Sequence, residues 1–342
     1  MKLQVVNEVS ALPVVSLVPA GYSAGSSALS KLEAARIAGE AHRRARLSIQ
    51  NIIQPGMTLR EIGEHIENCT RTLIGVGYNG GIGFPTGLSL NACAAHDTPN
   101  PKTADRVLQE NDVLKIDIGT HLDGHIVDSA FTVAFKPEYA NLLLAARDSV
   151  YECLKIAGPD TPLKDIGEKA EEVIRSYEVV IDGKTCGVRP VLNLNGHTIE
   201  QYKIHGGKYV PITKRSGNRD RMVEGEFYAI ETFATTGNGY VREQGDCSHY
   251  ALVNKNARSS LEGGRSLLEY LNRTFSTLPF CKRYIGPEVK SPDAYLAHLV
   301  KQGAVEQYPP LFDVPGSYVA QFEHTLYINS SGIEVMSKGE DY

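Results

Sequence analysis

The feature that most constrains the fold is a repeat within the chain. At an offset of 104 residues, the segment Arg60–Glu67 (REIGEHIE) aligns with Lys164–Glu171 (KDIGEKAE). Further along, the segment Glu110–Asp117 (ENDVLKID) aligns with Glu224–Glu231 (EGEFYAIE). In each copy a strand-like run therefore ends with a carboxylate residue. Chance similarity between two amphipathic helices is the alternative. Self-similarity of this kind indicates a duplicated structural unit, and we predict two related halves that bring their acids together at a shared seam.

Each half begins with a pair of predicted helices. Thr58 and Glu61 have the spacing of a capping box, which opens a helix whose apolar face includes Leu59 and Ile62. Pro55-Gly56 separates this helix from the one before it, because neither residue continues a helix readily. Apolar periodicity predicts helices over residues 30–54, 58–74, 140–157 and 161–177.

A glycine-rich segment follows the second predicted helix. Residues 75–87 contain six glycines among thirteen positions. Glycine lets the backbone approach a ligand or another strand closely, but it resists regular structure. We therefore predict a loop beside a site.

Strands are predicted where β-branched residues gather. The runs 113–119 and 126–135 flank Asp123-Gly124, a typical hairpin turn that would set Gly119 opposite Asp128 in an antiparallel pair. Further strands are predicted near residues 188–194, 202–205, 226–234 and 321–328.

The composition limits which cellular compartment and which classes of partner are expected. The chain has 342 residues, and 35 Lys plus Arg stand against 40 Asp plus Glu without a block of one sign, so we expect no direct nucleic-acid binding. The six cysteines include no Cys-x-x-Cys pair, which favours reduced thiols. The longest charge-free stretch, Val9–Ser30, contains two prolines and six serines and fits no membrane helix. We expect a cytoplasmic protein.

Two acids of the predicted hairpin would share one face. With Gly119 opposite Asp128, Asp117 becomes the diagonal neighbour of Asp128, about 7–8 Å away. Carboxylates placed this close repel each other unless divalent cations lie between them. For this pair taken alone, solvated turn acids are the alternative.

Three further residues extend this candidate metal site. Glu231 and Glu323 each lie in an otherwise apolar run, where burying an unpaired carboxylate is costly. His197 follows a glycine that permits close backbone approach, although a lone histidine is most often an ordinary polar residue. Together with Asp117 and Asp128, these residues offer four negative charges and one imidazole, which match two divalent cations better than a single zinc ion.

The same residues lie in motifs that closely resemble those of type 2 methionine aminopeptidases. The motifs are Cys93–His96 (CAAH), Lys115–Thr120 (KIDIGT), Asn193–His197 (NLNGH), Tyr228–Phe233 (YAIETF), Gln321–His324 (QFEH) and the closing Asp341-Tyr342. The resemblance implies the pita-bread fold, an α+β architecture of two pseudo-symmetric halves around an antiparallel sheet. Mixed carboxylate and histidine ligands suit Mn, Co, Fe or Zn. The resemblance implies two divalent ions bound by Asp117, Asp128, His197, Glu231 and Glu323.

The resemblance also implies removal of the initiator methionine from nascent proteins whose second residue is small. A hydroxide bridging two metal ions would attack the scissile carbonyl, and Glu231, besides binding metal, would shuttle the proton to the leaving amine. His96 and His205 would hydrogen-bond the substrate or stabilise the tetrahedral intermediate, and fumagillin-type epoxides would alkylate His96. The methionine pocket would be lined by Phe84, Ile204, Phe233, His249 and Tyr308.

An insertion in the second half is typical of the type 2 group. Residues 255–308 contain a helical pattern over 261–275, and residues 30–342 would form one catalytic domain around them. Residues 1–29 are expected to be extended or poorly structured, without the charged extension thought to take eukaryotic relatives to the ribosome. The expected partners are the N-termini of nascent polypeptides. How the protein would reach them at the ribosome, and whether it needs a tether to do so, is left open. Family likeness favours a monomer, and the lack of a membrane helix in the sequence favours a protein that contacts no membrane.

Two other functions stand as alternatives. A catalytically inactive relative that binds RNA or protein would have lost metal ligands, whereas all five ligand types are present here. An aminopeptidase P or prolidase would share the two-metal site but cleave next to proline. The insertion and the CAAH motif argue against that second alternative.

Overall fold

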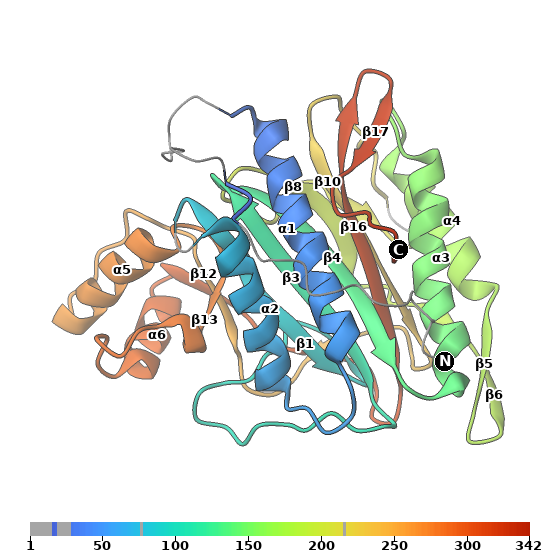
Figure 1. Ribbon diagram of the computed structural model, residues 1–342, viewed down its shortest axis with the longest axis horizontal. Coiled ribbons are helices and arrows are strands. Elements are labelled where there is room, and N and C mark those ends of the chain that lie inside the picture. Colours follow the sequence, from blue (N-terminus) through green and yellow to red (C-terminus); the bar gives the residue numbers. More distant parts are fainter. Residues whose placement is uncertain (1–15, 19–28, 76–77, 215–216) are drawn as a thin grey trace.

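The computed structural model of the chain describes residues 16–18, 29–75, 78–214 and 217–342 (Figure 1). Most of the predicted N-terminal segment, residues 1–29, lies outside the described residues. The remainder follows the duplicated plan predicted from the repeat, with two helices followed by antiparallel strands in each half. Among the described helices, none is both long enough and apolar enough to cross a lipid bilayer.

Four long helices form at the predicted positions. The first begins after Ser30 and the second after Thr58, and in both a glutamate three residues beyond the N-cap completes a capping box. The predicted pairing of Thr58 with Glu61 is thereby confirmed. The bounds are α1 Lys31–Ile52, α2 Leu59–Ile74, α3 Ala140–Ile156 and α4 Leu163–Arg175.

The first half contains a three-stranded antiparallel sheet in the order β1-β3-β4. Gly119 pairs with Asp128 and Asp117 with Ala130, which confirms the predicted hairpin and its register. The bounds are β1 Gly80–Leu90, β3 Val113–Leu122 and β4 His125–Ala134.

The prediction of a loop over residues 75–87 is wrong for residues 80–87, which form the first part of β1. The glycines allow β1 to lie unusually close to β3. A Cβ atom on Gly87 would lie 2.9 Å from Cβ of Asp117, and one on Gly119 would overlap the Phe84 ring. Register shifts on either side of Phe84 bend the strand. Glycine here serves a close approach between strands rather than a loop.

The second half forms a larger sheet in the order β17-β16-β10-β8-β9, with β7 beside β10. The strands predicted at 226–234 and 321–328 are confirmed as β10 and β16. Of the strand predicted at 188–194, only Arg189–Pro190 is extended in a sheet. The bounds are β7 Arg189–Pro190, β8 Asn195–Ile199, β9 Tyr209–Pro211, β10 Phe227–Thr235, β16 Val319–Asn329 and β17 Gly332–Val335.

The strand predicted at 202–205 is wrong, because this segment is a turn. Tyr202 has a φ of 58°, and its amide donates a hydrogen bond of 2.8 Å to the carbonyl of Gly124. The hydroxyl of Thr277 donates to the carbonyl of Tyr202. These tertiary hydrogen bonds override the local strand propensity, so the turn is held by contacts with two other parts of the chain.

The two halves meet where β4 and β16 lie side by side (Figure 1). Oγ1 of Thr325 accepts the amide of Asp128 at 2.8 Å and donates to its carbonyl at 2.7 Å. Oγ1 of Thr132 makes the same two bonds with Gln321, also at 2.8 and 2.7 Å. This reciprocal exchange of threonine hydroxyls marks a pseudo-two-fold axis between the halves.

The pseudo-symmetry extends to the helices and to the acids. Helix α1 packs on β3 and β4, and α3 packs in the same way on β10 and β16. Asp117 pairs with Ala130 across β3 and β4, and Glu231 pairs with Glu323 across β10 and β16. Asp117 and Glu231 are therefore equivalent, as the sequence repeat predicts.

Residues 249–308 form a lobe at the left of Figure 1, called here the insertion lobe. Its sheet has the order β13-β12-β14, and α5 and α6 pack behind it around one apolar cluster. The helical pattern predicted over 261–275 is confirmed as α5. The bounds are β12 His249–Leu252, α5 Glu262–Thr274, β13 Phe280–Cys281, α6 Pro292–Lys301 and β14 Val305–Tyr308.

A buried ion pair attaches the insertion lobe to the first half. The guanidinium of Arg283 donates to both carboxylate oxygens of Glu67, at 2.7 and 3.0 Å, and the hydroxyl of Tyr284 donates to the same carboxylate at 2.7 Å. The side chains of Arg283 and Glu67 are 7% and 1% exposed. The remaining elements are β2 Cys93–Ala95, η1 Pro137–Tyr139, β5 Glu178–Ile181, β6 Lys184–Gly187, β11 Arg242–Glu243, η2 Lys282–Tyr284 and β15 Leu311–Phe312.

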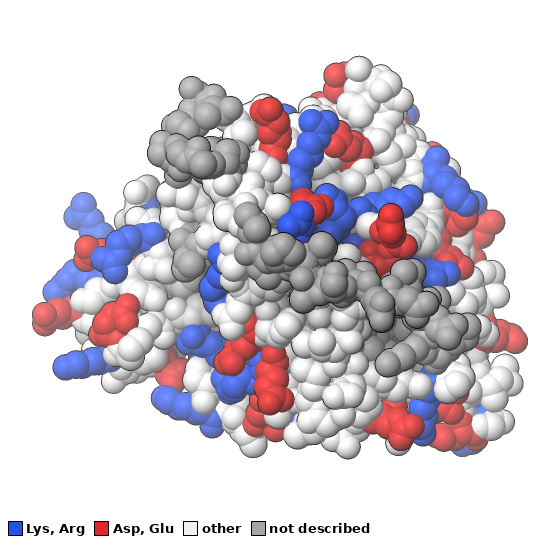
Figure 2. All heavy atoms as spheres, viewed as in Figure 1, with Lys and Arg blue, Asp and Glu red and all other residues white. Residues whose placement is uncertain are grey.

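Charged side chains are interspersed on the face of the molecule drawn in Figure 2. Many form exposed pairs, such as Arg36 with Glu334 at 2.7 Å. Such pairs contribute little to stability because water screens them. The mixing on this face agrees with the near balance of 35 basic and 40 acidic residues in the chain.

Candidate metal centre and substrate pocket

The five predicted metal ligands come from five strands and lie together. Each half contributes two acids, and β8 of the second half contributes the histidine. Four of the five line one pocket, and the fifth, Glu323, groups with Asp128 and His197 at its floor. The residues are Asp117 on β3, Asp128 on β4, His197 on β8, Glu231 on β10 and Glu323 on β16.

Strand pairing accounts for this convergence. Asp128 lies opposite Gly119 and is therefore a diagonal neighbour of Asp117. Glu231 and Glu323 lie directly opposite each other on β10 and β16. Because β4 and β16 run side by side at the seam, the pair from each half faces the pair from the other.

The ring of His197 is oriented as a metal ligand. Its Nδ1 atom lies 3.2 Å from the carbonyl oxygen of Thr198, which places the ring proton on Nδ1 because a carbonyl only accepts. The unprotonated Nε2 then faces Oδ2 of Asp128 at 3.6 Å. Burial lowers the pKa of His197 to about 3, so the ring is neutral at physiological pH. Nε2 of His197 and the carboxylate of Asp128 are therefore placed to bind one cation between them.

The cluster has donor atoms that are left without partners. One ligand atom from each of Asp128, His197 and Glu323 lies within 4.8 Å of the other two. Among the described residues, Oδ1 of Asp117, Oδ1 of Asp128 and Oε1 of Glu323 are buried without a hydrogen-bond partner. Buried polar atoms are almost always partnered. Oxygen and imidazole donors in this arrangement fit divalent cations such as Mn, Fe, Co or Zn.

The acids of the cluster resist ionisation when no cation is present. Burial raises the pKa of Asp117 to about 6. Burial, together with the charges of Asp117 and Glu231, raises the pKa of Asp128 well above its usual range. Burial and the neighbouring carboxylates act in the same direction on the pKa values of Glu231 and Glu323. Cation binding would displace the protons that these groups retain.

Gln321 is a functional neighbour that the sequence analysis missed. Its Nε2 amide donates to Oε2 of Glu231 at 3.1 Å and to Oδ2 of Asp117 at 3.3 Å. One amide thus joins a carboxylate from each half. Strand alternation could have revealed it, because Gln321 is two residues before Glu323 and shares its face of β16.

The remaining predicted site residues surround the same pocket. The rings of His96 and His205 lie 5.9 and 6.0 Å from that of Tyr308, and the rings of His205 and His197 meet edge to face at 4.6 Å. Burial lowers the pKa of His96 to about 3 and lowers the pKa of His205 as well. Both imidazoles are therefore neutral at physiological pH.

The pocket continues from the acids into an apolar chamber. Phe84, Ile204, His249 and Tyr308 line it, as predicted for the methionine pocket. Phe233 lines instead an adjoining cavity, which shares His96, His197, His205 and Glu231 with the first. The pocket walls that sequence reasoning missed are Pro85, Gly87, Ala95 and Pro279.

The insertion lobe supplies part of the chamber wall. His249 of β12 pairs with Tyr308 of β14, so one small sheet carries both side chains to the pocket. Nδ1 of His249 lies 2.9 Å from Oγ of Ser248, and Nε2 lies 3.4 Å from the carbonyl oxygen of Pro85. His96 faces these residues from a left-handed backbone position with a φ of 64°.

Comparisons with known proteins bear on the family and the fold of the chain. Residues 32–330 match the sequence profile of Metallopeptidase family M24. The chain is 50% identical over 320 residues to Methionine aminopeptidase 2 of Kluyveromyces lactis, an alignment that covers 90% of this chain and 76% of that protein. Two solved structures are similar in fold at 18% identity. A thermophilic Arx1 has a TM-score of 0.77, and the match covers 92% of this chain and 93% of that one. A methionine aminopeptidase of Thermotoga maritima has a TM-score of 0.62, and the match covers 93% of this chain and 100% of that one. These likenesses confirm the predicted pita-bread fold.

Proposed function

The chain belongs to metallopeptidase family M24 and, within it, to the type 2 methionine aminopeptidases, and on this basis we propose that it removes the N-terminal methionine from polypeptides. Membership of this family makes it a metal-dependent hydrolase. The observation that carries the proposal is the cluster of four carboxylates and one neutral histidine, in which three buried carboxylate oxygens lack partners and four of the five residues line one pocket.

The cluster would hold two divalent cations, because four negative charges balance two such ions. The five donors would be Asp117, Asp128, His197, Glu231 and Glu323. When bound, divalent cations lower the pKa of water and polarise a carbonyl group, which is the chemistry that amide hydrolysis requires. The family membership supports a metal in general, and the number of cations and their identity are part of this proposal.

We assign the proton transfer to Glu231. Its Oε2 atom accepts the amide of Gln321 at 3.1 Å, which leaves Oε1 to take a proton from the attacking water and pass it to the leaving amine nitrogen. Burial and the charge of Asp117 raise the pKa of Glu231 well above its usual range in the metal-free protein. Bound cations would displace that proton and leave the carboxylate able to accept one from water.

His96 and His205 would orient the scissile carbonyl. Their rings lie 5.9 and 6.0 Å from that of Tyr308, and both line the pocket that contains the acids. A neutral imidazole N–H can donate a hydrogen bond to the carbonyl oxygen, and that bond strengthens as negative charge develops there. His96 is also the nucleophile that a fumagillin-type epoxide would alkylate.

The methionine side chain would enter the chamber between Phe84, Ile204, His249 and Tyr308. A thioether offers dispersion and contacts with aromatic rings, and this lining provides both. Phe233 would contact the substrate from the adjoining cavity. Nascent polypeptides with a small second residue are the substrates that the family membership favours.

A peptide assay with added Mn²⁺ tests the proposed function. The full chain is incubated with Met-Ala-Ser and, separately, with an Xaa-Pro peptide, and the released amino acid is identified by mass spectrometry. We expect methionine from Met-Ala-Ser and no cleavage before proline. Cleavage of the proline peptide alone would indicate a prolidase, and Mn²⁺ binding without cleavage of either peptide would indicate an inactive relative.

A matched variant connects that assay with the proposed ligands. Asp128→Asn keeps the size of the side chain and removes one buried charge from the cluster. We expect weaker Mn²⁺ binding and a turnover lower by about two orders of magnitude or more. Turnover near that of the wild type would exclude Asp128 as a metal ligand.

A further inference from the structure

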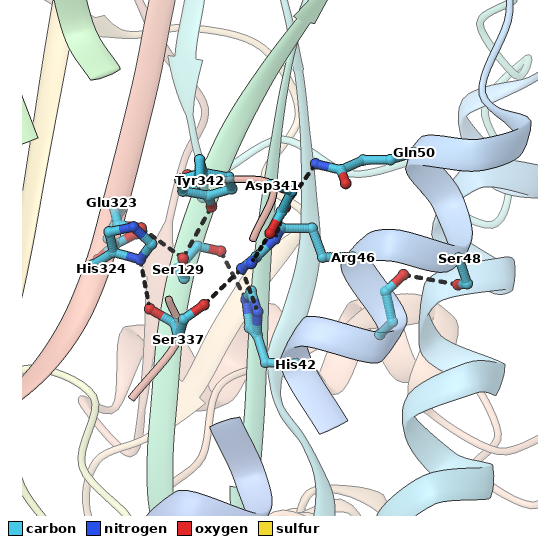
Figure 3. Close-up of polar contacts among 12 residues, drawn as sticks. His42, Arg46, Ser48, Gln50, Ser129, Glu323, His324, Ser337, Asp341 and Tyr342 are labelled. Carbon is cyan, nitrogen blue, oxygen red and sulfur yellow. Dashed lines mark hydrogen bonds and ion pairs between the residues drawn. The ribbon is translucent and has the colours of Figure 1, made fainter. Parts of the chain in front are cut away.

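Between helix α1 and the rear of strands β4 and β16 lies a buried polar cluster built on Arg46 (Figure 3). The side chains of Arg46 and Asp341 are 0% and 2% exposed and form a two-pronged ion pair, Nε to Oδ2 at 2.6 Å and Nη2 to Oδ1 at 2.7 Å. Nη1 of Arg46 donates to the carbonyl of Ser337 at 3.0 Å and lies 3.2 Å from Nδ1 of His42. Buried charges are tolerated when they are partnered as fully as these.

The same guanidinium lies against Tyr342. Its carbon is 4.4 Å from the centroid of the Tyr342 ring, and the other contacts of that ring include a stack on His324 with centroids 4.8 Å apart. The Tyr342 hydroxyl donates to the carbonyl of Ala130 at 2.8 Å and lies 3.1 Å from Oγ of Ser129. Tyr342 therefore contacts β4 through residues 129 and 130 and β16 through His324.

The strand residues that this cluster contacts adjoin two of the proposed metal ligands. Ser129 follows Asp128, and His324 follows Glu323. Because side chains alternate along a strand, Ser129 and His324 point away from the ligand face. Oγ of Ser129 donates to the carbonyl of Glu323 at 2.6 Å, and Nε2 of His42 lies 3.1 Å from the carbonyl of Ser129. The cluster therefore holds the backbone that carries both acids.

This contact is significant because of the way in which β4 and β16 are joined. In the described part of the chain these strands belong to different sheets, and the hydroxyls of Thr132 and Thr325 bridge them. Side chains, rather than a backbone ladder, set the separation of the strands. Ligand distances in metal sites are defined to within about 0.2 Å, so small changes in that separation weaken metal binding.

We propose that Arg46, Asp341 and Tyr342 are positioning residues for the metal centre, which fix the separation of Asp128 and Glu323 from behind the strands. The proposal rests on the proposed function, because it takes these two acids as metal ligands. None of the three residues lines the pocket or belongs to the proposed ligand set. They act through the backbones of β4 and β16.

Mn²⁺ affinity of the full chain, measured by titration calorimetry without any peptide, tests this positioning role. Tyr342→Phe retains the ring and removes the hydroxyl that contacts Ala130 and Ser129. Arg46→Met removes the ion pair and keeps an unbranched side chain. We expect the Kd for Mn²⁺ to rise about tenfold in Tyr342→Phe and up to about a hundredfold in Arg46→Met, as when partners behind metal ligands are removed elsewhere.

Arg283→Met is the matched control. Arg283 makes the same two-pronged contact with a buried carboxylate, and its side chain is 7% exposed, but its partners do not adjoin a proposed metal ligand. A general loss of stability would lower the melting temperature in both arginine variants. A positioning role raises the Kd for Mn²⁺ only in the variants of Arg46 and Tyr342.

The outcomes separate the two proposals. Unchanged Mn²⁺ affinity in Tyr342→Phe and Arg46→Met, with tight binding by the wild type, would overturn the positioning role and leave the proposed function intact. An equal loss of affinity in Arg283→Met would also overturn it. If Arg46→Met does not fold, the milder Tyr342→Phe decides alone. Absence of Mn²⁺ binding by the wild type would overturn the proposed function and the positioning role with it.

Discussion

Neutralising Asp117 should change the stability of the metal-free protein in a manner that depends on pH. Burial raises the pKa of this carboxyl from its ordinary value of 3.8 to about 6 in the folded protein. The folded state therefore holds the proton more tightly than the unfolded chain, so that ionisation destabilises the fold. The penalty is absent below pH 3.8 and complete above about pH 6. At about 1.4 kcal/mol for a pKa change of one, the rise from 3.8 to about 6 corresponds to about 3 kcal/mol.

The assay compares urea unfolding of the wild type and Asp117→Asn at pH 4 and pH 7 in the presence of a chelator. Asparagine has nearly the same shape as aspartate and does not ionise. Buried histidines such as His197, whose pKa is lowered, lose stability as the pH falls, but they do so in both proteins. Removing the charge of Asp117 also relieves the repulsion that raises the pKa values of Asp128, Glu231 and Glu323, and this favours the variant in the same direction as the pH rises. We therefore expect the Asp117→Asn variant to gain at least about 2 kcal/mol over the wild type between the two pH values.

Saturating Mn²⁺ should reverse this order at pH 7. The wild type keeps all of its ligands, so the cation stabilises it more than it stabilises Asp117→Asn. Two results would contradict this explanation. One is a stability difference between the metal-free proteins that does not change with pH, and the other is an equal stabilisation of both proteins by Mn²⁺.

Three further predictions concern the pocket and its supports. Gly87→Ala should weaken Mn²⁺ binding about tenfold, because the added Cβ atom would lie 2.9 Å from Cβ of Asp117. Gly187→Ala is the control and should leave Mn²⁺ binding unchanged, because no atom lies within 4 Å of the added Cβ. Arg283→Met should raise the KM for a methionyl peptide roughly tenfold at unchanged Mn²⁺ affinity, because Arg283 anchors the lobe that carries the pocket wall; an unchanged KM would contradict this. A fumagillin-type epoxide should modify His96, as checked by peptide mapping, and an adduct on another residue would count against the pocket.

The parts of the fold that follow from local signals could be predicted. The capping box at Thr58 and Glu61 and the Asp123-Gly124 turn each depend on a few neighbouring residues, and both form as predicted. The hairpin register in turn places Asp117 and Asp128 on one face. The repeat added a long-range constraint, because it related Asp117 to Glu231, and the motif resemblance grouped these acids with His197 and Glu323.

The parts that depend on distant contacts could not be predicted. Glycines at 80–87 indicate a loop locally, yet close approach to β3 makes them a strand. Tyr202 lies in a strand-like run but bonds to Gly124 from another part of the chain. The partners of Arg46 are likewise almost 300 residues away, at Ser337 and Asp341. No local pattern records such pairings.

Crystals grown with Mn²⁺ and measured at a wavelength at which manganese scatters anomalously would locate the cations directly. The proposed site predicts two anomalous peaks about 3.5–4 Å apart, among Asp117, Asp128, His197, Glu231 and Glu323. A single peak there would contradict the two-cation site. The absence of any peak among these five residues, in crystals that hold manganese elsewhere, would contradict the metal centre itself.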